Sequence, residues 1–206
     1  MTLDEFRARF PILARRIYVN SCSQGALSID VDEAMRAYLE SWHQDGSPWE
    51  MWVEQVERLR ARFAASIGAD ADEIAVMPSA SAGINAVASA LSFAGPRSHV
   101  VVGDFEFPTM AQVWLAQERR GAVIRRARAE GDTLPLAAYD AVIDERTLIV
   151  PATHVCFRNG HKTDIGGLVR LATIAARTSS WTTTSGRERG RSMSTRSAWI
   201  SWSPGA

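Results

Sequence analysis

Cysteine is scarce in this chain of 206 residues. Its two cysteines, Cys22 and Cys156, lie far apart and lack the close spacing that metal ligands show. We therefore expect no metal site, and a cytoplasmic location in a reducing environment is the simplest interpretation.

The sequence also lacks long apolar runs and a net charge. No run approaches the roughly 20 apolar residues of a membrane span, and the segment "MTLDEFRARF" is amphipathic with early acidic residues, unlike a signal peptide. The 23 basic and 23 acidic residues cancel, so we expect neither a nucleic-acid partner nor a membrane partner. The sequence contains neither a GxGxxG motif nor a Walker motif. The alternative that it is an unrelated nucleotide-binding α/β protein therefore has no support.

Strand and helix patterns alternate along the chain, whose composition is 46% hydrophobic and 22% charged, as in ordinary globular proteins. Strands are predicted at 16–20, 73–77, 99–104, 122–128 and 147–155. Helices are predicted at 2–10, 29–44, 49–68, 79–93, 108–121, 135–143 and 164–176. The alternation predicts an α/β fold, with a mostly parallel sheet covered by helices on both faces.

In such a sheet, ligands bind beyond the carboxyl ends of the strands. The first loop expected there, "MPSASAGIN", combines small residues, the hydroxyls of Ser79 and Ser81, and a following helix N-terminus. These features suit an anion such as phosphate. The alternative is an ordinary helix cap.

The second loop, "GDFEFPTMAQVW", contains Phe107 directly before Pro108, which favours an extended backbone at Phe107. Its ring is suited to stack on a flat cofactor. The alternative is a core aromatic at the end of a strand.

The third loop, "THVCFRNGHKTDIGG", is dense in polar side chains after a strand, which suggests a site. A structural role for each histidine, and simple packing for Cys156, remain open. The candidate residues are His154, Cys156, Arg158, Asn159, His161 and Lys162.

Taken in order, these loops resemble one family, the class V aminotransferase-like enzymes of fold type I that depend on pyridoxal phosphate. The family includes cysteine desulfurases, kynureninase and isopenicillin-N-epimerase-like proteins. The segment "YVNSCSQGALS" is similar to the family's N-terminal segment, and "PSASAGIN" to its phosphate loop. The segment "EFPTMAQVW" resembles the family's ring-stacking segment, and "THVCFRNGHKTDI" resembles the loop that follows it in kynureninase and the desulfurases.

The resemblance implies cofactor-binding positions. Ala80 and Ser81 would hold the phosphate through backbone and hydroxyl groups, and Phe107 would stack on the pyridine ring. Phe157 stands at a cofactor-binding position where desulfurases have Asn and kynureninase has Tyr. A kynureninase-like or general class V protein is therefore favoured over a desulfurase, which also needs a cysteine on a later loop.

The resemblance further implies an amino-acid substrate, close to Asn20, Ser21 and Cys22, and a homodimer in the intact family. The enzymes act through a Schiff base on a lysine, and an aspartate faces the pyridine nitrogen. The only lysine here, Lys162, lies on the wrong loop. We therefore assign no catalytic residue and expect no turnover; the alternative is a non-catalytic fragment or pseudogene product that binds a partner subunit.

The stretch from Arg177 has no apolar period, and its only acidic residue is Glu188 among five arginines. Because Trp is always TGG and Thr always ACN, "SWTTTS" read one base earlier permits Val-Asp-Asp-Tyr-Gln. Read in the same way, "RSMS" permits Ile-Asp-Val and "AWISW" permits Val-Asp-Phe-Leu. These are the strand and aspartate elements that the family would show there.

We therefore predict that the chain is out of frame from about residue 177, through an insertion, a deletion or a sequencing error. A native Ser/Arg-rich disordered tail is the alternative. The predicted organisation is an N-terminal segment at 1–48, a partial large domain that binds pyridoxal phosphate at 49–176, and an out-of-frame, disordered tail at 177–206.

Overall fold

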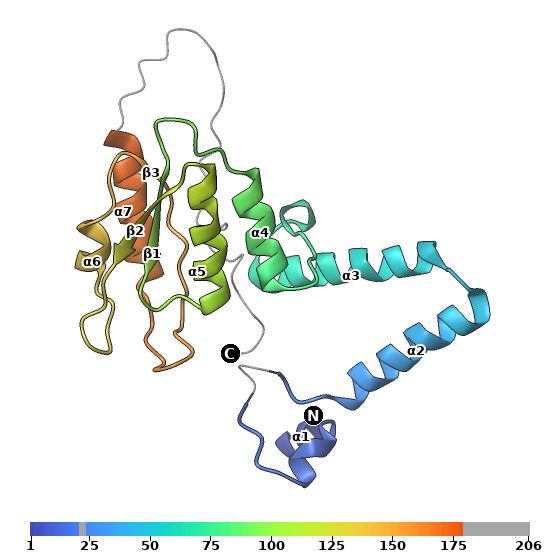
Figure 1. Ribbon diagram of the computed structural model, residues 1–206. Coiled ribbons are helices and arrows are strands. Elements are labelled where there is room, and N and C mark those ends of the chain that lie inside the picture. The colour runs from blue at the N-terminus through green and yellow to red at the C-terminus, as the bar shows by residue number, and fades with distance from the viewer. Residues whose placement is uncertain (21–23, 179–206) are drawn as a thin grey trace. The chain divides into compact units, whose positions relative to one another are not determined.

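The computed structural model describes residues 1–20 and 24–178 of the chain (Figure 1). These residues form two compact units, one over Met1–Val76 and one that begins at Met77. The predicted out-of-frame, disordered tail begins at residue 177, and its residues 179–206 lie outside the described residues.

The first unit is helical. Its elements are α1 (Leu3–Ala8), η1 (Pro11–Ala14), α2 (Ile29–Asp45), α3 (Trp49–Ile67) and η2 (Ala71–Glu73). Thr2 caps α1 reciprocally with Glu5, because its hydroxyl accepts from the Glu5 amide and its own amide donates to the Glu5 carboxylate. Gly68 ends α3 in a left-handed conformation with φ of 67°.

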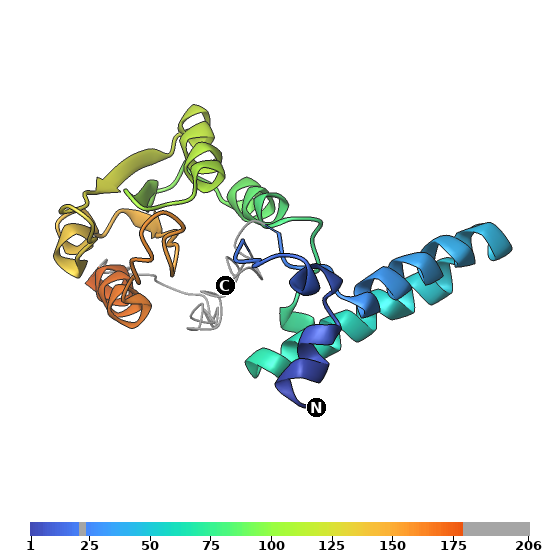
Figure 2. The same cartoon turned by 90° about the horizontal axis from the view of Figure 1, so that it is seen from below.

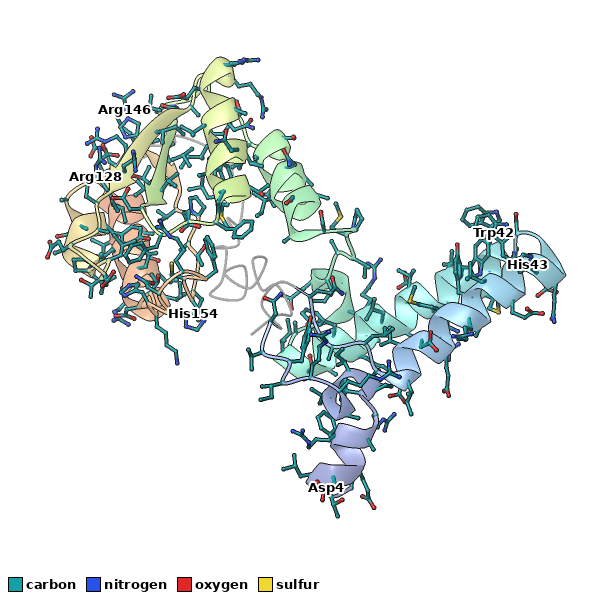
Figure 3. The ribbon with its side chains drawn as sticks, turned by 60° about the horizontal axis from the view of Figure 1, so that its bottom comes forward. Asp4, Trp42, His43, Arg128, Arg146 and His154 are labelled. Carbon is teal, nitrogen blue, oxygen red and sulfur yellow. The ribbon has the colours of Figure 1, made fainter. Side chains whose placement is uncertain are left out.

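The helices α2 and α3 meet through aromatic side chains. The ring of Tyr38 lies 6.1 Å from that of Trp42 and 5.2 Å from that of Trp52. Trp42 is labelled near the end of α2 in Figure 3. Among the described residues of this unit only Ser28 and Ala64 are buried. The unit therefore has little core of its own.

The second unit is a parallel sheet with helices. Its elements are α4 (Ala80–Ala90), β1 (His99–Gly103), α5 (Pro108–Leu115), η3 (Ala116–Arg120), β2 (Val123–Ala127), α6 (Leu136–Asp140), β3 (Thr147–Ile149) and α7 (Ile165–Thr178). The strand order is β2-β1-β3, and both pairings are parallel. His99 starts both ladders, opposite Val123 on one side and Thr147 on the other.

The central strand β1 buries both of its faces. Val100 and Val102 belong to a core that they share with α4 and α5, whereas Val101 belongs to a second core with α6 and α7. Figures 1 and 2 show these two helix pairs on opposite sides of the sheet. The predicted α/β class with helices on both faces is confirmed.

Two predicted strands are wrong. Residues 16–20 and 74–77 form no strand in the structure, and residue 73 ends η2. Ile74 is extended, with φ of −108° and ψ of 124°. An extended, apolar segment becomes a strand only when a neighbour pairs with it, and among the described residues none pairs with these two.

The described helices do not meet the requirements of a membrane span. None of them is both long enough and apolar enough to cross a bilayer.

Candidate functional site

Three loops meet at the carboxyl edge of the sheet. The chain leaves β1 after Gly103, β2 after Ala127 and β3 after Ile149, and the strands are parallel, so these exits share one edge. Helices α4 and α5 begin at the same edge, as Figure 1 shows. This edge is where the open sheet of an α/β protein offers a binding site.

The first predicted site segment forms the start of α4. Ser79 is the N-cap residue, and its hydroxyl accepts a hydrogen bond from the Ala82 amide at 3.1 Å. Ala80 is exposed and Ser81 is half-buried in the first turn of the helix. In the described part of the chain no acceptor engages the amides of Ala80 and Ser81. Two amide donors and the positive end of the helix dipole are thus left for an anion.

The second segment presents the ring of Phe107. Its backbone is extended, with φ of −65° and ψ of 139°, and Pro108 begins α5. The side chain is 50% exposed, which excludes the alternative of a core aromatic. Its ring meets that of Phe157 edge to face, with centroids 5.2 Å apart and planes at 65°. Phe157 is 52% exposed, so the structure brings two predicted cofactor residues together and leaves both rings accessible.

Two carboxylates join the β1–α5 loop to its neighbours. Asp104 accepts from the Arg126 guanidinium at 2.6 Å and from the Ala129 amide at 3.0 Å, both on the β2 side. Burial opposes ionisation of Asp104, but these donors hold its pKa below the usual range. Glu106 reaches the other side, where it accepts from the Thr153 amide at 2.9 Å and from the Thr153 hydroxyl at 2.7 Å.

Glu106 is buried, with 9% of its surface exposed. Burial raises the pKa of its carboxyl group, and the two hydrogen bonds from Thr153 oppose that rise. The phenol of Tyr139 is buried below the same loop. Burial raises the pKa of Tyr139, and the charges of Glu106 and Asp104 raise it further.

The third segment is a closed loop, two of whose polar side chains bind the neighbouring loop between β2 and α6. The Nε2 of His161 accepts from the Leu134 amide at 3.3 Å, and Asn159 donates to the Asp132 carbonyl at 3.1 Å. Cys156 is buried in the core and packs as a small apolar residue, as its sequence context allowed. His154, labelled in Figure 3, and Lys162 are exposed on this loop.

The predicted substrate residues belong to the other unit. Asn20 is exposed, and its carbonyl accepts from the Gln24 amide at 3.2 Å. Ser21 and Cys22 lie outside the described residues. The role of these three residues stays a prediction.

The groups at this edge fit two parts of pyridoxal phosphate. The open amides of Ala80 and Ser81 match a phosphate, and the accessible rings of Phe107 and Phe157 match a flat aromatic ring. Sequence reasoning missed Asp104 and Glu106. The signal was present, because both are acidic residues that alternate with aromatic ones directly after a buried strand.

Solved structures share this fold. The chain resembles a mutant of the cystine C–S lyase C-DES that carries glycine covalently linked to its PLP cofactor, with a TM-score of 0.73, 20% identity, and coverage of 80% of this chain and 45% of that one. It also resembles the apo cysteine desulfurase of Thermococcus onnurineus NA1, with a TM-score of 0.69, 19% identity, and coverage of 85% and 46%. At these identities the likeness shows the fold.

Curated relatives match at the sequence level. The chain is 33% identical over 169 residues to the uncharacterized aminotransferase YcbU of Bacillus subtilis, which covers 82% of this chain and 45% of the relative. It is 27% identical over 178 residues to a probable cysteine desulfurase of Methanothermobacter thermautotrophicus, and 28% identical over 177 residues to the kynureninase of Deinococcus radiodurans. These alignments cover 84% and 81% of this chain, but 44% and 42% of the relatives. The chain therefore spans less than half the length of the curated relatives it matches.

The family match covers most of the described chain. Residues 26–176 match the family model described as Aminotransferase class-V. This range contains α4, both site rings and the two carboxylates of the β1–α5 loop. The chain belongs to the class-V aminotransferase family.

Proposed function

We propose that the carboxyl edge of this sheet holds pyridoxal phosphate in a protein that acts on an amino acid. The first turn of α4, with Ala80 and Ser81, takes the phosphate, and Phe107 with Phe157 takes the ring. When bound, the cofactor supplies an electron sink for electrons released at the substrate's α-carbon. The observation that carries the proposal is the pair of accessible rings beside open helix amides at one edge.

The residues of this chain have separate tasks in that proposal. The phosphate is neutralised and oriented by the amides of Ala80 and Ser81 and by the Ser81 hydroxyl. Phe107 covers a ring face and excludes water from it. Phe157 carries no hydrogen-bonding group, so it contributes shape and apolar surface where desulfurases present an amide.

The binding experiment is a titration of the purified 206-residue chain with pyridoxal phosphate, followed by fluorescence. Replacing a stacking phenylalanine removes about 1–3 kcal/mol, so Phe107→Ala should weaken binding about 5- to 150-fold. Phe93→Leu, a change inside the core of the same unit, serves as the control for folding. Equal affinity of the wild-type chain and Phe107→Ala would contradict the ring assignment.

We further propose that this chain does not turn over its substrate. Its only lysine is Lys162, which is exposed and pairs in an antiparallel bridge with Val155. The expected result is cofactor binding without conversion of amino acids to keto acids, ammonia or sulfide. Turnover that persists in Lys162→Arg would contradict this part of the proposal but would not contradict the proposed binding site.

A second candidate function is association with another subunit, either as a homodimer or as a non-catalytic fragment. The observation that favours it is the exposed apolar surface of α2 and α3. Its exposed residues are Val31, Met35, Tyr38, Leu39, Trp42, Trp49, Met51, Val53, Val56 and Leu59. Sedimentation velocity tests it: a monomer across micromolar concentrations would contradict association.

A further inference from the structure

The side chain of Glu106 links the loop that carries Phe107 to the loop that carries Phe157. Beside this link lies a longer contact of 3.5 Å from the Arg158 guanidinium to the Asp104 carbonyl. Glu106 directly precedes Phe107, and its two carboxylate oxygens accept from the amide and the hydroxyl of Thr153 at 2.9 Å and 2.7 Å. Thr153 follows β3, four residues before Phe157. A carboxylate that receives two donors from one residue fixes direction as well as distance.

Thr153 in turn holds the base of the Phe157 loop. Its carbonyl accepts from the Thr163 hydroxyl at 2.8 Å, and the Thr163 amide donates to the His154 carbonyl at 2.9 Å. The bridge between Val155 and Lys162 closes the loop above them. Hydrogen bonds therefore connect Glu106 through Thr153 to the base of the loop that presents Phe157.

Burial makes a charged carboxylate energetically unfavourable at the position of Glu106. Glu106 is 9% exposed, and in the described part of the chain no lysine, arginine or histidine forms an ion pair with it. Tyr139 is buried below the loop of Glu106. The charged groups that act on its phenol are Glu106 and Asp104, and both are acidic. Burial of a carboxylate without a neighbouring cation is unfavourable unless hydrogen bonds stabilise it. The two donors from Thr153 stabilise the carboxylate in part, and burial still raises its pKa.

We propose that Glu106 is a positioning residue, whose carboxylate clamps the β3–α7 loop against the β1–α5 loop and so sets the angle at which Phe157 meets Phe107. The two rings form the surface assigned above to the cofactor ring, and in that respect the inference rests on the proposed function. The clamp itself is a property of the chain without any ligand.

The first experiment uses hydrogen exchange of the 206-residue chain without ligand. Glu106→Gln keeps the size of the side chain but removes its charge, so the hydrogen bonds with Thr153 lose their charge assistance and exchange of the Thr153 amide should speed about tenfold. Thr153→Val removes the hydroxyl donor and should speed exchange at Thr163. Thr153→Ser retains both donors, so its amide protection should equal that of the wild-type chain. Unchanged protection in Glu106→Gln would overturn the clamp.

The second experiment separates the ring surface from the phosphate cradle. Pyridoxamine 5′-phosphate needs no lysine for binding and reports on both parts, whereas inorganic phosphate reports on the start of α4 alone. Glu106→Gln should weaken pyridoxamine phosphate about tenfold and leave inorganic phosphate unchanged. An equal loss of both ligands would mean general loosening and would overturn the positioning role.

The two failures remain distinguishable. If the wild-type chain binds neither ligand, the proposed function fails, and the exchange pattern of Thr153 and Thr163 still decides the clamp. If the wild-type chain binds both ligands but Glu106→Gln matches it in every readout, the clamp fails and the proposed function stands.

Discussion

His99 and Asp144 are joined near the amino ends of β1 and β3, where the Nδ1 of His99 lies 2.9 Å from the Oδ1 of Asp144. The imidazole is buried, and Asp144 also accepts from the Thr147 hydroxyl and the Arg146 amide, each at 3.1 Å. Burial opposes ionisation of Asp144, but the bond and charge of His99, together with these other donors, lower its pKa. The pair fastens the sheet at the end opposite the candidate site.

Asp144→Asn should therefore destabilise the chain in a pH-dependent way. At neutral pH the loss is about 1–3 kcal/mol, because a buried imidazole loses a charged partner. A lowered folded pKa adds stability that is present above the ordinary value of 3.8 and disappears as pH falls through the lowered value. The free energies of unfolding of the wild-type chain and Asp144→Asn should therefore approach each other as the pH falls. Denaturant unfolding of both from pH 7 down to pH 3 measures this.

Asp140→Asn is the matched control, because Asp140 is exposed on α6 and loses the same charge. It should change the free energy of unfolding by no more than about 0.5 kcal/mol. Equal effects of the two variants at neutral pH would contradict the role given to the His99 pair.

Gly103→Ala should disturb the end of β1. A Cβ at this position would clash with the Tyr139 hydroxyl and stand 2.7 Å from the Leu134 Cδ2. Tyr139 is 1% exposed, so neither neighbour has room to move, and we expect a loss of about 1–3 kcal/mol. Gly95→Ala, where a Cβ meets nothing within 4 Å, should leave the thermal midpoint nearly unchanged.

Arg120→Lys should loosen the end of α4 although it keeps the charge. The guanidinium donates to the carbonyls of Ala88, Ser89 and Leu91 at 2.9–3.1 Å, a fork that an ammonium group does not reproduce. We expect a loss of about 1–2 kcal/mol in the free energy of unfolding. Arg119→Lys, one residue earlier and exposed, should be close to neutral. A smaller effect at Arg120 than at Arg119 would refute the capping role.

The nucleotide sequence tests the predicted change of reading frame. The prediction places the change at about residue 177, directly after the family match, which ends at residue 176. We expect that shifting the frame there yields family-like codons for the aspartate-bearing strand. Transcripts that confirm the present frame would exclude a sequencing error. Codons that fail to restore those segments would exclude the frameshift altogether.

The sequence predicted the sheet where apolar runs were flanked by turn residues, as at His99–Gly103 and Val123–Ala127. The strands predicted at 16–20 and 73–77 were wrong, because residue propensity indicates an extended backbone but not whether a partner strand is present. Phe107 was found from its place before Pro108. Glu106 was not, because its role depends on Thr153, which lies 47 residues away along the chain and is brought close only by the fold.

The order β2-β1-β3 places the first-made strand in the middle of the sheet. Val100, Val101 and Val102 leave the ribosome before Val123–Ala127 and well before Thr147–Ile149. Until those partners are made, an apolar strand with two open edges is exposed to other nascent chains, which is the situation that leads to aggregation. Production of this unit in cells should therefore depend on chaperones that bind short apolar segments during translation.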